Sequence, residues 1–491
     1  MSKPVELSSE DWTKLTWTFD LSKYSELTED NIGKAYIYII TDPMTSAYYA
    51  DDFMLKSDKA GDGTFYDDYN LPAPADGISP TATGQTYFAA DTVDVDTGIT
   101  ALYQKYADKF KIGGTLANEL VENSGTRNIK IYEKLFKKHF NTTSSDGYFK
   151  IEEILNDSKD LNAYTFANAD KIMKFCNDNG VEVIGHALIW DKEKMYNYFY
   201  DGGKGGTKKY DRDGLLAFMK EYITRVMNHF NGKGDASEYT VDGYTGGGVK
   251  TWDVLNEACD AVSSLALWPD GYRVKNYPYK YIIGADYGRY AFKYAHEADP
   301  EAELRYNDYG EQVPKEVLMD TSKADSVAAY VKSLTDPEDS SKSYVDKIGV
   351  QSHYDIESDI ETIKESLDKY AETGLKLDIT ELDIKAYTSA QRKAEEAIYE
   401  DGVPKAVEYK QAKLMRELFD KYESMSAHID RVNFWTFSDL YAYPNKEGFT
   451  HKEYAGIFDR KFAPKPQYYI LVETEAEFNA RYPDYQKYVT Q

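Results

Sequence analysis

The sequence predicts an α/β protein built on a (β/α)8 barrel, preceded by a short partial β-sandwich segment and a linker. From about residue 110 onward, short apolar runs alternate with helix-sized segments, as in parallel α/β folds. Two of the runs end on a glutamate, Glu257 and Glu381, and barrels of this class carry their reactive groups at the carboxyl ends of strands. Gly113-Gly114 is too short for a phosphate-binding loop, which disfavours an open doubly wound sheet.

The first sixty residues differ from the rest of the chain. KAYIYIIT and SAYYADDFML alternate in polarity and carry aromatic residues, which is typical of antiparallel strands. So few strands make a poor independent sandwich. We therefore expect residues 1–60 to be the end of a sandwich whose other strands lie upstream of Met1. Residues 61–97, which include LPAPADGISPTATG, are expected to form a linker, and residues 98–491 the barrel domain.

Eight strand candidates follow in the barrel region. Between them, apolar residues recur at the spacing of one helix face, most clearly over residues 215–230 and 360–370. This alternation predicts eight strand–helix units in a closed parallel barrel. The strands are expected to begin near Phe110, His139, Val181, Val249, Glu303, Lys347, Leu375 and Arg431.

Composition limits the classes of partner. The formal net charge of −26 disfavours nucleic acid and anionic membranes as partners. No apolar run approaches the roughly 20 residues of a membrane span. The 45 tyrosines offer flat apolar faces with polar tips, which suit sugar rings. With only Cys176 and Cys259, we expect no metal-ligand cluster, and a disulfide between them stays open.

Glu257 and Glu381 are the strongest candidates for chemistry. Each ends a run with the character of a buried parallel strand, VKTWDVLNE and LKLDITE, and two strand–helix units lie between them. Two facing carboxyl groups are the minimum equipment for cleaving a glycosidic bond. The alternative is that each glutamate caps a strand and pairs with a nearby base, because fully buried carboxylates are rare.

The resemblance to a known family covers about residues 98 to 475. Eight motifs carry it, in this order: NTTSSDGYFK, GHALIW, WDVLNEA, RYNDYG, IGVQSHY, ITELD, FWTFSD and GIFDRKFAPKPQYY. Together they resemble glycoside hydrolase family 10, the retaining endo-β-1,4-xylanases. The resemblance implies hydrolysis of xylan or xylo-oligosaccharides by double displacement, without a metal or other cofactor. It also implies a secreted or cell-surface protein, and it makes residues 1–60 a candidate fragment of a carbohydrate-binding module.

MSKPVELSSE has no apolar signal core, so we expect either an intracellular protein or one whose signal was removed. Oligomeric state is left open.

The resemblance assigns roles to individual residues. Glu257 matches the acid/base and Glu381 the nucleophile. Asn256 matches a side chain that holds the sugar 2-hydroxyl. His353 matches a histidine that hydrogen-bonds the nucleophile, with Asp383 behind it. The resemblance implies that the remaining matched residues bind the substrate: Lys150, His186, Trp190, Gln351 and Trp435. For the two tryptophans, the alternative is an ordinary position in the core. Asn307 and Asp308 are expected to brace the barrel top rather than to touch substrate.

Several positions depart from the family pattern. Asp146-Gly147 replaces the usual Glu-Asn, and Ile151 replaces a Trp. Asp191 replaces a His, Glu193 a Gln, and Tyr443 a late Trp. The resemblance therefore implies an intact catalytic pair and a remodelled second glycone subsite. Two rivals remain: a β-1,4-glycanase of different specificity, and a catalytically weak barrel that only binds xylan.

Overall fold

The structure is a computed structural model. It describes the backbone of two short strands at 78–80 and 86–88 and, beyond them, residues 99–122, 127–145, 147–156, 161–259, 275, 277–314, 322–388, 390–391, 399, 403–440, 453–460 and 462–489. The segment predicted as a sandwich fragment, residues 1–60, lies outside these ranges. Within the predicted linker, β1 (Ile78–Pro80) pairs antiparallel with β2 (Thr86–Phe88). The domain boundaries themselves remain predictions.

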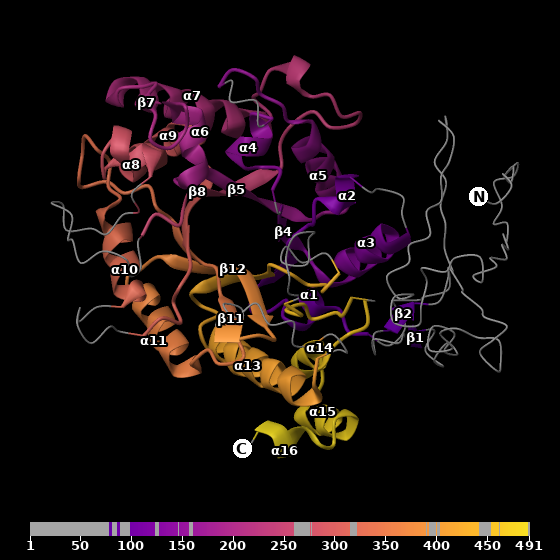
Figure 1. Ribbon diagram of the computed structural model, residues 1–491. Helices are drawn as coiled ribbons and strands as arrows, with labels where there is room; N and C mark the ends of the chain where they lie inside the picture. The colour runs from indigo at the N-terminus through magenta and orange to yellow at the C-terminus, as the bar shows by residue number, and fades with distance from the viewer. Residues whose placement is uncertain are drawn as a thin grey trace, which may run out of the picture. The chain divides into compact units, whose positions relative to one another are not determined.

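The described part of the chain forms a closed barrel of eight parallel strands, so the predicted fold class is confirmed (Figure 1). Each strand pairs with the next one along the chain, and the last returns to the first through Arg431 and Lys111. A short strand, β11 (His353–Asp355), follows β10 and pairs with the end of β12. The barrel strands are β3 (Lys111–Gly114), β4 (Thr142–Ser144), β5 (Glu182–Trp190), β8 (Val249–Asn256), β9 (Glu303–Asp308), β10 (Lys347–Val350), β12 (Lys376–Lys385) and β13 (Ile429–Phe434).

The second strand starts three residues later than the sequence pattern predicts. Helix α3 (Arg127–His139) extends through His139, and the strand begins at Thr142. His139 is fully buried at the helix end, and its Nδ1 accepts a hydrogen bond from the Leu102 N–H at 3.4 Å. Burial lowers the pKa of His139 to about 3, so this side chain is neutral and packs as part of the core.

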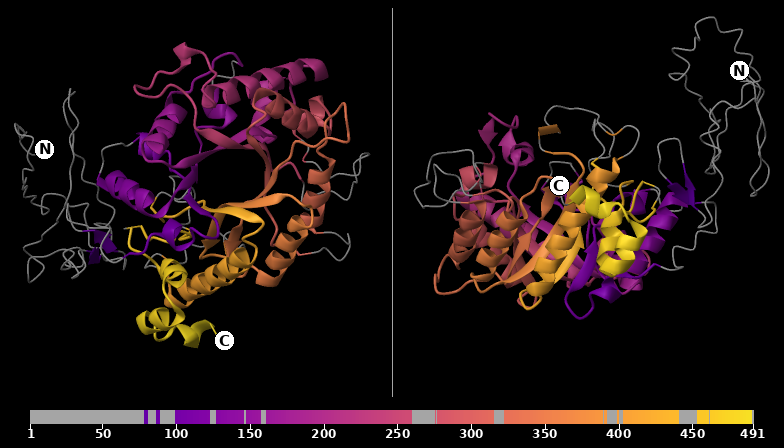
Figure 2. Two further views of the ribbon diagram at one scale, coloured as in Figure 1. Left: turned by 180° about the vertical axis from the view of Figure 1, so that it is seen from behind. Right: turned by 90° about the horizontal axis from the view of Figure 1, so that it is seen from below.

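Helices surround the strands on the outside (Figures 1 and 2). The two predicted from apolar spacing are confirmed as α7 (Arg212–Phe230) and α11 (Ile360–Ala371). Aspartates 211 and 359 cap their first turns by accepting backbone N–H hydrogen bonds. The other longer helices are α5 (Ala167–Asp178), α9 (Tyr287–Ala298), α10 (Lys323–Ser333) and α13 (Lys405–Ser424).

Short elements complete the described structure. They are α1 (Leu102–Lys105), α2 (Glu119–Glu122), α4 (Ile151–Ile154), α6 (Tyr196–Phe199), α8 (Pro278–Ile282), α14 (Pro466–Val472), α15 (Glu475–Arg481), α16 (Tyr485–Val489), the 3-10 turns η4 (Glu193–Met195) and η5 (Ala236–Glu238), and the hairpin β6 (Tyr200–Asp201) with β7 (Thr207–Lys208). Cys176 and Cys259 are free and buried. No helix among the described residues is long and apolar enough to cross a membrane.

A buried charge network ties the strands together inside the barrel. The Arg305 guanidinium donates to Asp253 on β8 at 2.6 Å and to Asp378 on β12 at 2.8 Å. All three side chains are almost fully buried. Because breaking a buried ion pair strands a charge, this network opposes any shift in strand register. Asp253 in turn contacts His186, so the network extends up to the candidate site.

Candidate active site

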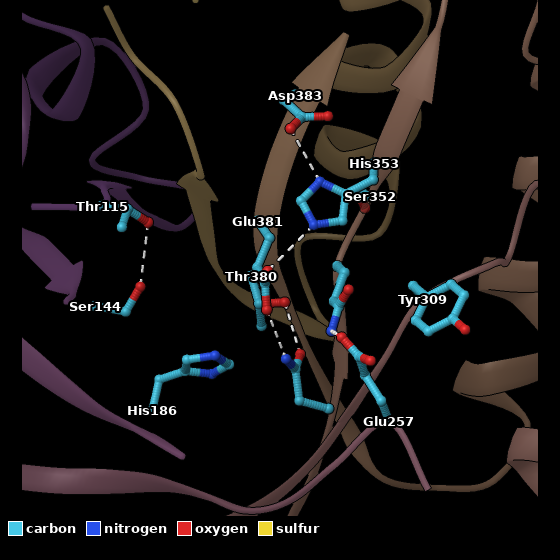
Figure 3. A network of polar contacts seen from close by, with 12 residues as sticks. Thr115, Ser144, His186, Glu257, Tyr309, Ser352, His353, Thr380, Glu381 and Asp383 are labelled. Carbon is cyan, nitrogen blue, oxygen red and sulfur yellow. Dashed lines mark hydrogen bonds and ion pairs between the residues drawn. The ribbon is translucent and has the colours of Figure 1, made fainter. Parts of the chain in front are cut away.

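Glu257 directly follows the carboxyl end of β8, whereas Glu381 lies within β12, which continues past the predicted strand end at Glu381 to Lys385 (Figure 3). Glu257 adopts a left-handed backbone conformation with φ of 54°. Its N–H donates to the Asn307 carbonyl on β9 at 2.8 Å, which fixes this turn. A side-chain-bearing residue in this region costs on the order of 1–3 kcal/mol, and such outliers cluster at functional sites. The turn redirects Glu257 at the point where the strand ends.

Glu381 is held on both carboxylate oxygens. Its Oε1 accepts a hydrogen bond from Asn307 Nδ2 at 2.8 Å, and its Oε2 lies 3.2 Å from His353 Nε2. Burial alone would raise the pKa of Glu381, but the hydrogen bonds from His353 and Asn307 and the nearby histidines lower it. Glu381 is therefore ionised at neutral pH, as a nucleophile requires.

His353 links Glu381 to Asp383 (Figure 3). Its Nδ1 lies 3.0 Å from Asp383 Oδ2, and Lys385 donates to the other oxygen of Asp383 at 2.7 Å. Burial favours neutral His353, but the charge of Asp383 and the hydrogen bonds to both carboxylates outweigh it and raise the pKa to about 10. The pairing of His353 opposite Asp383 comes directly from the β11–β12 register. His353 is thus a cation that donates to Glu381.

Glu257 has different partners. Its Oε1 accepts a hydrogen bond from Gln351 Nε2 at 3.1 Å, and its Oε2 lies 3.4 Å from Lys275 Nζ. The Glu257 side chain is 18% exposed, against 7% for Glu381. Glu257 is the more accessible of the two carboxylates and has one ionic partner from outside the strands.

Asn256 lies beneath the two carboxylates with one buried donor left over. Its Oδ1 accepts a hydrogen bond from Asn307 Nδ2 at 2.9 Å. Its own Nδ2 is buried and makes no hydrogen bond within the described structure. A buried donor without a partner costs about 1–3 kcal/mol, so this geometry favours a ligand group that accepts from Asn256.

Aromatic and basic side chains gather beside the carboxylates. Lys150 Nζ lies 5.3 Å from the ring centroid of Trp190 and 5.7 Å from that of Trp435. The Trp435 ring also packs edge-to-face against two histidine rings. Its ring centroid lies 5.8 Å from that of His186 and 6.1 Å from that of His353. Both tryptophans are partly exposed, so neither is fully enclosed in the core.

One predicted site residue, Glu193, is not brought into this group. Glu193 is 62% exposed and forms an ion pair with Lys204 at 2.6 Å. Asp146 and Tyr443 lie outside the described residues.

Two of the departures from the family pattern have structural explanations. Asp191 is buried and accepts from the N–H groups of Tyr279 and Lys280, so it caps α8. Burial raises the pKa of Asp191 to about 7, even though these two hydrogen bonds act in the opposite direction. At Gly147, an added Cβ would lie 3.0 Å from the side-chain Nδ2 of Asn118. The space beside Gly147 is therefore partly filled by Asn118.

Sequence reasoning missed two contacts. Asn307 was expected only to brace the barrel, yet it donates to Glu381 and to Asn256. The register that pairs Asn256 with Asn307 carries this signal, but register is visible only in the folded sheet. Lys275 was missed altogether, because it lies in a connecting segment without a motif. Among the described residues, no group of three or more His, Cys, Asp or Glu is arranged to hold a metal ion.

Comparisons with known proteins agree with this geometry. Residues 101–474 match the model for glycosyl hydrolase family 10. Endo-1,4-beta-xylanase A of Thermotoga maritima is 31% identical over 379 residues, which are 77% of this chain and 31% of that protein. Exoglucanase XynX of Acetivibrio thermocellus is 27% identical over 468 residues, 95% of this chain and 36% of that protein. The chain thus spans about a third of the length of these curated relatives.

A solved structure matches over a similar range. It is the intracellular xylanase TsXylA from Thermoanaerobacterium saccharolyticum in complex with xylotriose. The two chains share 28% sequence identity with a TM-score of 0.59, and the match covers 77% of this chain and 99% of the other.

Proposed function

The chain belongs to glycosyl hydrolase family 10, and from this premise we propose that it is a retaining endo-β-1,4-xylanase. The observation that carries the proposal is the unequal treatment of the two carboxylates. Each carboxylate contacts one amide donor and one cation, but Glu381 is 7% exposed with contacts at 2.8 and 3.2 Å, whereas Glu257 is 18% exposed with contacts at 3.1 and 3.4 Å. Two carboxyl groups in different environments are the requirement for acid/base and nucleophilic roles in one site.

In the first step, Glu381 attacks the anomeric carbon and Glu257 donates its proton to the leaving glycosidic oxygen. This produces a covalent glycosyl-enzyme and releases one product. In the second step, Glu257 takes a proton from water, and the water oxygen displaces Glu381 with net retention of configuration. His353 stabilises the departing carboxylate because it stays protonated throughout the neutral range.

Asn256 contributes in the transition state. Its unpaired Nδ2 is available to donate to the 2-hydroxyl of the sugar that is being transferred. Hydrogen bonds to this hydroxyl strengthen as the ring gains oxocarbenium character. Lys150, His186, Trp190 and Trp435 form the surroundings of the same sugar, with aromatic faces for its apolar side and polar groups for its rim.

We assign the altered positions to the second glycone subsite, as the resemblance implies. Gly147 has no side-chain amide to offer there, and Glu193 forms an ion pair with Lys204. A weakened second subsite leaves the Glu257–Glu381 pair in place and lowers the preference for long unbranched chains. Secretion stays a prediction from the resemblance, since one relative is described as an intracellular xylanase.

One assay tests the proposal. The protein is incubated separately with unbranched xylan, arabinoxylan, a β-1,4-glucan and a β-1,4-mannan. Product lengths are followed by chromatography, and the anomeric configuration of the first products is followed by NMR. We expect xylo-oligosaccharides of mixed length from xylan, released as β-anomers. Release of α-anomers or of single sugars from the chain end would overturn the assignment.

A glycanase of different specificity is the second candidate. It is favoured by the similarity to a protein named an exoglucanase over 95% of this chain. Faster release of oligosaccharides from β-1,4-glucan than from xylan would support it. The third candidate, a barrel that only binds xylan, is excluded if turnover is lost in Glu381→Ala while binding of xylohexaose remains.

A further inference from the structure

We propose that Lys275 is a positioning residue for Glu257, and that its ammonium group favours the ionised form of this carboxylate and so sets the alkaline limit of activity. The inference rests on the proposed function, in which Glu257 is the acid/base. It adds a residue that lies in a connecting segment, outside every motif of the sequence.

The contact is built into the fold on two sides. Lys275 Nζ lies 3.4 Å from Glu257 Oε2, and the two side chains are only 16% and 18% exposed. The Lys275 N–H donates to the carbonyl of Ala258, the residue directly after Glu257, at 2.9 Å. The ammonium also lies 4.7 Å from the ring centroid of Tyr309. Backbone and side chain together therefore hold the cation against the carboxylate.

The other charges around this pair do not replace Lys275. From β9, Asp308 approaches Lys275, but Asp308 also pairs with Lys323 of α10 at 3.1 Å. Lys323 faces the same Tyr309 ring at 4.8 Å and is fully buried. From β10, Gln351 is neutral and contacts the opposite oxygen of Glu257.

The cation His353 of β11 contacts Glu381 and Asp383 of β12. Lys275 is thus the cation in direct contact with Glu257 among the residues that the structure describes.

Lys275 itself stays charged. Burial alone would lower its pKa, but the charges of Glu257 and Asp308 and the neighbouring Tyr309 raise it above its usual value. A fixed positive charge therefore faces Glu257 over the whole working range of pH.

The consequences for the two steps are opposite. The first step needs protonated Glu257, which an adjacent cation disfavours. The second step needs ionised Glu257, which the same cation favours. The value of kcat/KM reports the free enzyme and the first step, so its alkaline limb follows the loss of the proton from Glu257. Removal of the ammonium should move this limb to higher pH.

The test compares Lys275→Met, which removes the charge, with Lys275→Arg, which keeps it. Lys275→Gln serves as a second neutral variant in case the methionine variant folds poorly. Lys220→Met is the matched control, because Lys220 of α7 also forms an ion pair, with Glu297 at 2.8 Å on the outer surface. The pH profile of kcat/KM is measured with an aryl β-xylobioside that has a poor leaving group.

We expect the alkaline limb to rise by about one pH unit in both neutral variants, the size of one charge interaction at this distance in a partly hydrated site. Lys275→Arg and Lys220→Met should keep the wild-type limb. An alkaline limb that does not move in the neutral variants, even with a lower rate at every pH, would show that Lys275 is only structural and would overturn the proposal.

A second readout separates this inference from the proposed function. The Glu257 carboxyl is titrated by 13C NMR, with wild type, Lys275→Met and Glu257→Gln compared to assign the signal. If the Glu257 carboxyl titrates at higher pH in Lys275→Met than in wild type, the inference is supported. This holds even if wild type hydrolyses no xylan, and in that case only the proposed function fails. Unchanged titration overturns the role of Lys275 even in an active xylanase.

Discussion

The surroundings of Glu381 and of Glu257 differ in burial, backbone conformation and contact distance, although each carboxylate contacts one amide donor and one cation. Glu381 lies within β12 and takes hydrogen bonds at 2.8 Å from Asn307 on β9 and at 3.2 Å from His353 on β11. Glu257 lies just past the end of β8 in a left-handed turn, with partners at 3.1 and 3.4 Å.

The difference teaches which part of the fold suits which chemistry. A group that must stay ionised is placed in regular structure, where it is more buried and its hydrogen bonds are shorter. A group that must change its protonation state is placed at a strand end, where contacts are longer and the side chain is more exposed. The predictions below test this contrast.

Replacement of Glu381 should have the largest effect. Glu381→Ala removes the proposed nucleophile, so turnover of xylan should fall below about 1% of wild type, since a nucleophile contributes several kcal/mol to catalysis. Initial rates of reducing-sugar release measure this. Circular dichroism should show an intact fold, because the change only shortens a side chain at the barrel rim. Retained turnover above that level would remove Glu381 from the nucleophile role.

Replacement of Glu257 should have an effect that depends on the leaving group. Glu257→Ala should lose roughly 10²–10⁴-fold on xylan, the usual contribution of a general acid, but far less on an aryl xyloside with an acidic phenol. Added azide should restore turnover and give a β-glycosyl azide, because the missing carboxylate leaves room for a small anion. Equal losses on both substrates and no azide product would indicate a structural role instead.

Asn307 and Gln351 offer a matched pair of smaller changes. Asn307→Ala removes a hydrogen bond to ionised Glu381, which is worth about 1.5–3 kcal/mol, so kcat/KM should fall roughly 10- to 100-fold. Since this bond helps to lower the pKa of Glu381, the acidic limb of the pH profile should move to higher pH.

Gln351→Ala should instead affect the alkaline limb, because Gln351 contacts Glu257. If both variants move the same limb, the two carboxylates are not held independently.

The raised pKa of His353 predicts that the free energy of unfolding depends on pH. Its pKa is about 6.5 in an unfolded chain and rises to about 10 in the folded protein. Its protonation therefore stabilises the fold fully below about pH 6.5, and this contribution is lost as the pH rises through about 10.

Between about pH 7 and about pH 10, wild type should lose roughly 1–3 kcal/mol of unfolding free energy relative to His353→Gln. This energy is set below the full value of the pKa shift because the His353 ring is partly exposed to solvent. Urea unfolding at several pH values measures this. Asp383→Asn should reduce the same pH dependence, and a constant difference between wild type and His353→Gln would contradict it.

The smallest effect is expected at Gly147. An asparagine at this position would meet Asn118, so Gly147→Asn alone should not improve cleavage of linear xylo-oligosaccharides. In combination with Asn118→Ala, it should gain about 0.5–1.5 kcal/mol of transition-state binding, or up to about tenfold in kcat/KM on xylohexaose. Asn118→Ala alone is the control. A higher kcat/KM in the single Gly147→Asn variant would show that the Asn118 side chain moves aside at little energetic cost.

Much of the architecture was predictable from local patterns. The eight strands and the helices α7 and α11 appear where apolar spacing placed them, because burial of one face imposes a period on the sequence. The start of the second strand was misplaced, since His139 is a buried, neutral helix residue and its type gives no sign of this. Eight of the predicted site residues gather around the two glutamates through the contacts described above. They are Lys150, His186, Trp190, Asn256, Gln351, His353, Asp383 and Trp435.

By itself, the sequence determined the barrel and the position of Glu257 at a strand end, because both depend on periodicity. The His353–Asp383 pair was given by the family resemblance, and β12 continues past Glu381. Only the tertiary structure decided that Asn307 reaches Glu381, that Lys275 lies against Glu257, and that Asn118 fills the space beside Gly147. These contacts join strands and connecting segments that are far apart along the chain. They depend on strand register and on the path of a loop, and neither leaves a periodic trace in the sequence.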